Sequence, residues 1–167
     1  MDFDDLLVNT YLLFKNNEQI RRKYANKYQY VLVDEYQDTN SVQQAIVTLL
    51  TKDLQRVCVV GDDAQSIYSF RGANIDNILN FQKEYTNVRL FKLEQNYRST
   101  QLIVQAANSL IKKNERQIPK DVYSCNEAGE RLTLKPAYSD REEAIIVCQD
   151  IKRIKREDGC QYSDFAI

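Results

Sequence analysis

The sequence contains no histidine among its 167 residues. A Ser-His-Asp triad, a Cys-His dyad and every zinc site that uses histidine are therefore excluded. The four cysteines include no pair with C-x-x-C spacing, which excludes a thioredoxin-like redox motif and disfavours a zinc ribbon. We therefore expect four free thiols in a protein of a reducing compartment.

Glycine is also scarce, and this limits how a nucleotide could be bound. Only four glycines are present, and none of them is followed by lysine. The sequence therefore lacks a G-x-x-x-x-G-K-[ST] phosphate loop. Without that loop, the amide cradle and the lysine that hold the β- and γ-phosphates are missing from this chain.

Long apolar runs and an excess of positive charge are absent too. No apolar run approaches the roughly 20 residues that a membrane helix needs. The first residues, MDFDD, are acidic rather than basic, which argues against a signal peptide. We expect a cytoplasmic protein without a membrane partner. The 23 basic and 24 acidic residues exclude a uniformly basic nucleic-acid binder but still allow a local basic groove.

The sequence does contain the material of a globular protein, with 43% hydrophobic and 28% charged residues. Strand-like and helix-like segments alternate along it. This alternation predicts an α/β layered fold with a mostly parallel sheet. The expected strands are residues 30–33, 57–60, 88–93 and 131–134, and the expected helices are residues 3–14, 42–50, 75–79, 102–111 and 140–158.

Several boundaries can also be predicted. Asn40 or Ser41 should cap the helix over 42–50, Ser99 the helix over 102–111, and Asp140 the helix that ends near Gly159. Residues 114–129 should be a loop or an extended stretch. The apolar residues 165–167 look like the beginning of a strand, which suggests a piece of a longer protein.

Three unusual turns each follow a predicted strand, where parallel α/β sheets bind ligands. In the first turn, Asp34 and Glu35 are adjacent carboxylates. One of them could hold magnesium, usually through water, while the other orients or deprotonates the attacking water. The alternative is an acidic cluster that only stabilises the start of a helix.

The second turn spans residues 61–73 and combines a polar Gln65 with two rings and an arginine. Tyr68 and Phe70 are two residues apart, so both rings could face stacked bases if the stretch is a loop or extended, with Arg71 beside them. The alternative is that both rings fill the core.

The third turn, residues 96–100, begins a helix. Arg98 could reach a phosphate, and Tyr97 could stack on a base. The alternative is a surface arginine beside a packed tyrosine.

Taken in order, these turns resemble the motifs of superfamily 1 DNA helicases of the UvrD/PcrA/Rep type. Residues 33–40 (VDEYQDTN) resemble the family's Walker B motif, residues 60–73 (VGDDAQSIYSFRGA) its third motif, and residues 93–100 (LEQNYRST) its fourth. Residues 1–7 (MDFDDLL) resemble the segment where the family's chain re-enters its first RecA-like domain.

The resemblance implies a P-loop NTPase fold of RecA type, with ATP and Mg²⁺ as cofactors. Residues 1–95 would be the later half of the first RecA-like domain and residues 96–167 the opening of the second. Asp34 would bind Mg²⁺, and Glu35, also near the metal, would activate water. Gln65 would sense the γ-phosphate.

The remaining roles implied by the resemblance divide between nucleotide and DNA. Tyr97 would lie on the adenine, and Arg98 would contact the γ-phosphate as an arginine finger. Tyr68, Phe70 and Arg71 would bind single-stranded DNA, with Phe3 as a further DNA contact. The family often has tryptophan where Phe70 stands, and phenylalanine keeps the stacking face without the indole donor.

The implied activity is that of a parent ATP-dependent helicase that moves 3′ to 5′ on single-stranded DNA and unwinds duplex DNA in replication or repair. The 167-residue chain alone is expected to be inactive and to self-associate through exposed sheet edges. Two alternatives remain open: a naturally short, non-catalytic relative that binds single-stranded DNA or a protein, and the motor part of a helicase–nuclease.

Overall fold

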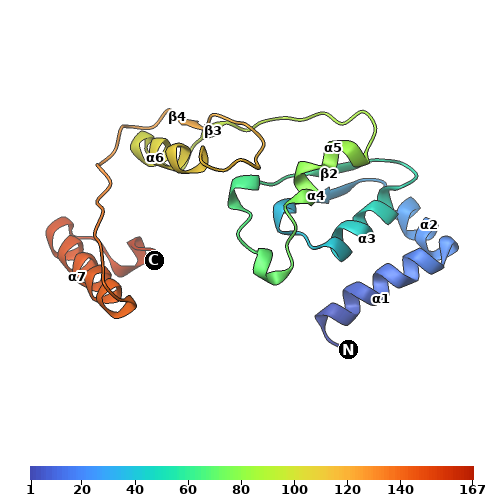
Figure 1. The fold of residues 1–167 in the computed structure, drawn as a ribbon, viewed down its shortest axis with the longest axis horizontal. Helices are drawn as coiled ribbons and strands as arrows, with labels where there is room; N and C mark the ends of the chain where they lie inside the picture. The colour runs from blue at the N-terminus through green and yellow to red at the C-terminus, as the bar shows by residue number, and fades with distance from the viewer. The chain divides into compact units, whose positions relative to one another are not determined.

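A computed structural model describes all 167 residues, which form two compact units, Met1–Glu127 and Ala128–Ile167 (Figure 1). The predicted boundary near residue 95 stays a prediction, and each unit is described by itself. No helix in the structure is long and apolar enough to cross a membrane.

The first unit opens with two helices, α1 (Phe3–Asn16) and α2 (Glu18–Lys27). The predicted first helix is confirmed, and Asp2 caps it. The Asp2 carboxylate accepts a hydrogen bond from the Asp5 amide over 2.9 Å, and the Asp5 carboxylate accepts one from the Asp2 amide over 3.1 Å. Both helices pack on α3 (Ser41–Thr51), as Figure 1 shows.

A two-stranded parallel sheet follows, made by β1 (Val31–Val33) and β2 (Val57–Val59) with α3 as the crossover. Val31 is in register with Val57. Asn40 caps α3, because its side-chain oxygen accepts hydrogen bonds from the Val42 and Gln43 amides over 3.0 and 2.9 Å. The predicted strands, the helix and its Asn40 cap are therefore confirmed.

The core of the first unit lies on one face of this sheet. It centres on Tyr36, Phe81 and Tyr85, against which Val33, Val57 and Val59 of the sheet pack. Phe81 belongs to α5 (Phe81–Glu84), which follows α4 (Asp76–Leu79). The helix predicted over residues 75–79 is thus confirmed as α4.

Only one face of this sheet is covered by the core. Leu32 and Cys58, which are paired in register, point away from the core, and Leu32 is 76% exposed. The reason is that α4 and α5 supply apolar partners to one face of the sheet, while this chain supplies no cover for the other.

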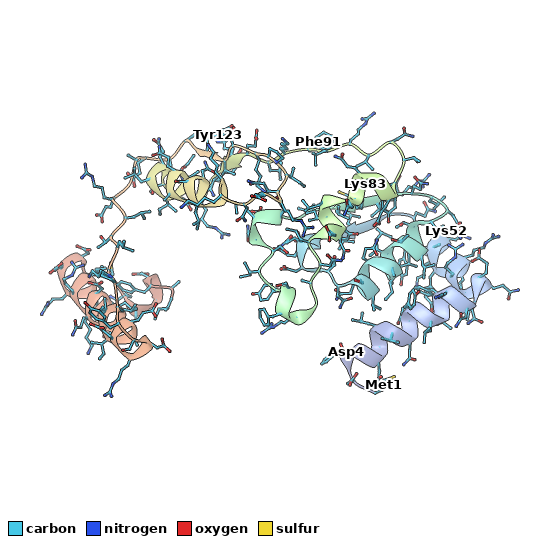
Figure 2. All side chains as sticks on the ribbon, in the orientation of Figure 1. Met1, Asp4, Lys52, Lys83, Phe91 and Tyr123 are labelled. Atoms are coloured by element: carbon cyan, nitrogen blue, oxygen red, sulfur yellow. The ribbon has the colours of Figure 1, made fainter.

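The strand predicted over residues 88–93 is also wrong. The strand in this region is β3 (Gln95–Asn96), which pairs in parallel with β4 (Tyr123–Ser124), inside the stretch predicted to be a loop or extended. Residues 88–93 form an irregular connection, and Phe91 on it is 78% exposed (Figure 2). Their apolar alternation suits a strand, but a strand also needs a neighbour that completes its backbone hydrogen bonds.

Helix α6 (Gln101–Ile111) confirms the predicted helix but not its cap. Thr100 occupies the N-cap position and makes no capping hydrogen bond with its side chain. The Ser99 amide instead donates to the Asn96 side-chain oxygen over 2.8 Å, which places Ser99 in the turn before the helix.

The second unit is dominated by α7 (Asp140–Asp158). Ser139, rather than Asp140, caps it by accepting a hydrogen bond from the Glu142 amide over 3.2 Å. Gly159 ends it in the left-handed conformation, with φ 72°, as predicted. Residues 131–134 and 165–167 form no strands, since neither has a pairing partner. The observed fold is mixed α/β with two small parallel sheets.

Candidate functional site

The parallel pairing of β1 and β2 brings the first two turns together. Beyond the strands, the Val60 amide donates to the Val33 carbonyl over 2.8 Å, and the Tyr36 amide donates to the Val60 carbonyl over 3.0 Å. The turn after β1 is therefore hydrogen-bonded to the turn after β2. This is the edge of a parallel sheet at which ligands bind.

Glu35 makes the sharp bend in the first turn. It has a left-handed backbone, with φ 49° and ψ 40°, which is uncommon for a residue other than glycine. Its amide donates to the Asp34 carboxylate over 2.9 Å, and the short helix η1 (Tyr36–Asp38) begins directly after it. Both carboxylates are exposed. Backbone strain of this kind concentrates at functional sites.

Gln37 connects the two turns, and sequence reasoning missed it. Its side chain is buried, its Nε2 donates to the Glu35 carboxylate over 2.8 Å, and its Oε1 accepts a hydrogen bond from the Asp62 amide over 3.0 Å. One buried amide therefore satisfies a backbone donor and orients Glu35. Its position two residues after Glu35 was the available signal, but a glutamine in a turn is ordinary.

The second turn contains the short helix η2 (Asp63–Gln65), capped by Asp62. The Asp62 carboxylate accepts hydrogen bonds from the Ala64 amide over 3.1 Å and from the Gln65 side chain over 2.8 Å. A hollow of about 500 Å³ lies between the two turns. It is lined by Glu35, Gln37, Asp38, Ala64, Gln65, Ile67 and Tyr68.

The structure thus brings Glu35, Gln65 and Tyr68, which come from two separate turns, around one hollow. Asp34 lies beside the hollow without lining it. No group of three or more acidic or cysteine side chains forms a ready-made metal site. One Asp34 oxygen accepts the Glu35 amide while the other has no partner within the chain, which suits Mg²⁺ held by one carboxylate, waters and phosphates.

The rings of the second turn are exposed, so the alternative that they fill the core is wrong. Phe70 is 75% exposed. The stretch is the short helix η3 (Ser69–Arg71) rather than an extended segment. The ring centroids of Tyr68 and Phe70 are 6.0 Å apart, and the Arg71 guanidinium lies 5.4 and 5.3 Å from them. These distances fit cation–π contacts that hold the three side chains as one cluster.

The other predicted site residues lie outside the hollow. Tyr97 is 78% exposed, and its hydroxyl donates to the Gln95 side chain over 3.0 Å. Arg98 is exposed and forms no ion pair, and Phe3 is exposed at the start of α1. The alternative of a packed tyrosine in the third turn is therefore wrong.

A second contact missed by sequence reasoning joins Lys120 to the second turn. The Lys120 ammonium lies 2.6 Å from both the Asp62 and the Asp63 carboxylates. Burial alone would raise the pKa of Asp62, but hydrogen bonds from Lys120 and Gln65 outweigh it and lower that pKa. Burial alone would lower the pKa of Lys120, but its bonds to Asp62 and Asp63 raise it. No local pattern signals a partner this distant in sequence.

Two family models match this chain. The model of the UvrD/REP helicase N-terminal domain matches residues 1–86, and that of the UvrD-like helicase C-terminal domain matches residues 91–167. Together they cover all three turns and the contact of Lys120 with the second turn.

Over all 167 residues, the chain is 46% identical to the ATP-dependent DNA helicase PcrA of Staphylococcus aureus. It is 44% identical to the protein of the same name from Staphylococcus epidermidis and 43% identical to that from Leuconostoc citreum. The chain spans 23%, 23% and 22% of the length of these three relatives, respectively.

Proposed function

Because the chain belongs to the UvrD/REP helicase family, we propose that it is part of an ATP-dependent DNA helicase that moves 3′ to 5′ along one strand and unwinds duplex DNA. The observation that carries the proposal is the hollow in which Glu35, Gln65 and Tyr68 meet. A predicted water-activating group, a phosphate-sensing group and a DNA-facing ring then share one site. The four free thiols fit work in the cytoplasm.

On the nucleotide side, residues 33–40 act as the Walker B motif. Asp34 would hold Mg²⁺, which neutralises charge on the phosphates during transfer. Glu35 accepts the proton of the attacking water, and its hydrogen bond from Gln37 keeps the carboxylate oriented toward the hollow. Gln65 contacts the γ-phosphate, Arg98 stabilises its charge, and Tyr97 stacks on the adenine.

On the DNA side, the Tyr68–Phe70–Arg71 cluster offers exposed rings and a positive charge. Bases stack on Tyr68 and Phe70, while Arg71 holds the rings in place and attracts the backbone. Phe3, exposed on α1, adds a further contact. Tyr68 also lines the hollow, so a change at Gln65 when the nucleotide changes reaches the DNA-facing rings directly.

The 167-residue chain alone should not hydrolyse ATP, because no phosphate loop holds the β- and γ-phosphates. The function is therefore tested in a chimera, in which this chain replaces the matching segment of the S. aureus PcrA. We expect the chimera to hydrolyse ATP when DNA is present and to unwind substrates with a 3′ tail rather than a 5′ tail.

The matched variant of that chimera is Glu35→Gln, which keeps the shape but removes the proton acceptor. It should reduce kcat by about 100-fold or more while ATP binding persists. An inactive parent chimera that is folded, or a Glu35→Gln variant with full activity, would count against the proposal. Magnesium-dependent ATPase activity of the isolated chain would contradict its expected inactivity.

A further inference from the structure

We propose that Lys120 is a positioning residue that holds the second turn and, through Asp62, orients Gln65. The inference rests on the proposed function, because it concerns how Gln65 is presented to the nucleotide. It goes further in assigning a role to a residue outside the three helicase-like turns.

Lys120 contacts a buried carboxylate, that of Asp63, which has few other partners. Asp63 is buried, with a side chain only 3% exposed, and its carboxylate also accepts a hydrogen bond from the Ile118 amide over 2.8 Å. A buried carboxylate is unfavourable without a cation and hydrogen-bond donors. Lys120 supplies the cation, and Ile118, two residues earlier, supplies a donor.

The same ammonium reaches the functional turn through Asp62. One Asp62 oxygen accepts hydrogen bonds from Lys120 and from the Ala64 amide, and the other accepts one from the Gln65 side chain. Asp62 is therefore fixed by Lys120 on one side and fixes Gln65 on the other. Without Lys120, the Asp62 carboxylate loses its only cation and can rotate, and Gln65 can rotate with it.

The contact joins two segments of the chain that match different family models, and it couples the second turn to the later segment. Asp62 and Asp63 lie in the segment that matches the N-terminal domain model, whereas Lys120 lies in the segment that matches the C-terminal domain model. Arg116 makes a second such contact, with Asp76. Movement of residues 116–120 away from the turn would break the Lys120 contacts, so the orientation of Gln65 depends on the placement of the C-terminal segment.

The first test uses the 167-residue chain and needs no nucleotide. Hydrogen exchange would be followed by mass spectrometry for residues 61–71 and for α3, in the Lys120→Met and Lys120→Arg variants. The matched control is Lys112→Met, because Lys112 forms only an exposed, 3.7 Å ion pair with Asp121. We expect about tenfold faster exchange over residues 61–71 in Lys120→Met, unchanged exchange in α3, and recovery in Lys120→Arg.

The second test asks whether Lys120 acts through Gln65. In the chimera, Lys120→Met should lower kcat about tenfold and leave KM for ATP within about twofold. Adding Lys120→Met to the Gln65→Ala variant should lower kcat little further, because that variant no longer has a Gln65 side chain for Lys120 to orient.

The outcomes separate the two proposals. Unchanged exchange over residues 61–71, or equal acceleration in α3, overturns the positioning role, whatever the chimera does. Fully additive effects on kcat also overturn it. An inactive parent chimera with the expected exchange pattern counts against the proposed function alone.

Discussion

The buried Gln37 side-chain amide donates a 2.8 Å hydrogen bond to the exposed Glu35 carboxylate. The other end of the same amide accepts the Asp62 backbone donor over 3.0 Å. The turn after β1 and the turn after β2 are therefore joined through one buried side chain.

Replacing Gln37 with leucine should destabilise the chain, because leucine has a similar volume but leaves the Asp62 amide without its partner. We expect the free energy of unfolding to fall by about 1–3 kcal/mol in chemical denaturation. Gln105→Leu on α6 is the control, since Gln105 is exposed and makes no side-chain hydrogen bond. Equal stability of the two variants would contradict the role given to Gln37.

Gly61 should not tolerate alanine, because a Cβ atom there would lie 2.6 Å from the Gln37 Oε1 and 2.9 Å from the Ile78 Cδ1. The resulting overpacking should lower the free energy of unfolding by about 1–3 kcal/mol. Gly159→Ala is a useful comparison, since it meets no neighbour and introduces only the strain of a left-handed backbone. Only Gly61→Ala should also alter hydrogen exchange in residues 34–38.

Phe70→Ala should weaken binding of the chain to single-stranded DNA by about 1–3 kcal/mol, the usual contribution of one stacked base. Fluorescence anisotropy with a labelled oligothymidine measures the affinity. Phe91→Ala provides the control, because Phe91 is just as exposed but lies on the connection after α5. If both variants bind as the unaltered chain does, the exposed cluster does not stack on DNA.

Glu18 should contribute a pH-dependent part of the stability. Hydrogen bonds from Arg21, and then from Arg22, lower the pKa of Glu18 from 4.5 to about 2. Since the folded-state value is lowered, the contribution is present above pH 4.5 and is lost as the pH falls toward 2. The difference in unfolding free energy between the unaltered chain and Glu18→Gln should therefore disappear over this range.

The control for Glu18 is Glu115→Gln, since Glu115 is exposed and forms no ion pair. At neutral pH, it should lower the free energy of unfolding by less than Glu18→Gln does. A Glu18→Gln difference that persists unchanged at pH 2 would show that the carboxylate contributes through shape rather than charge.

The exposed face and edges of the β1–β2 sheet should make the chain self-associate. Leu32 and Cys58 lie side by side on that face, and both strands are edge strands. Sedimentation velocity should detect oligomers that Leu32→Lys reduces, because a charge on this face disfavours pairing. Leu134→Lys, in the second unit, should leave the oligomers unchanged.

Much of the local structure was predictable because its causes are local. Asn40 followed by an apolar helical pattern predicted α3 and its cap, and the β-branched runs predicted β1 and β2. The sequence predicted that each turn follows a strand, and the parallel pairing of β1 and β2 places Glu35 and Gln65 at one sheet edge. The failed strand predictions have one physical cause, since residues 88–93 and 131–134 have strand-like patterns but no neighbouring strand to pair with.

The sequence by itself determined the family, the acidic and aromatic turns and their order, because motif chemistry depends on residue types at fixed spacing. Only the tertiary structure decided that Gln37 joins two turns and that Lys120 pairs with both Asp62 and Asp63. Those contacts form because folding buries certain charges and amides, and each of these then needs a partner. Residues distant in sequence supply such partners, and no local pattern can specify them.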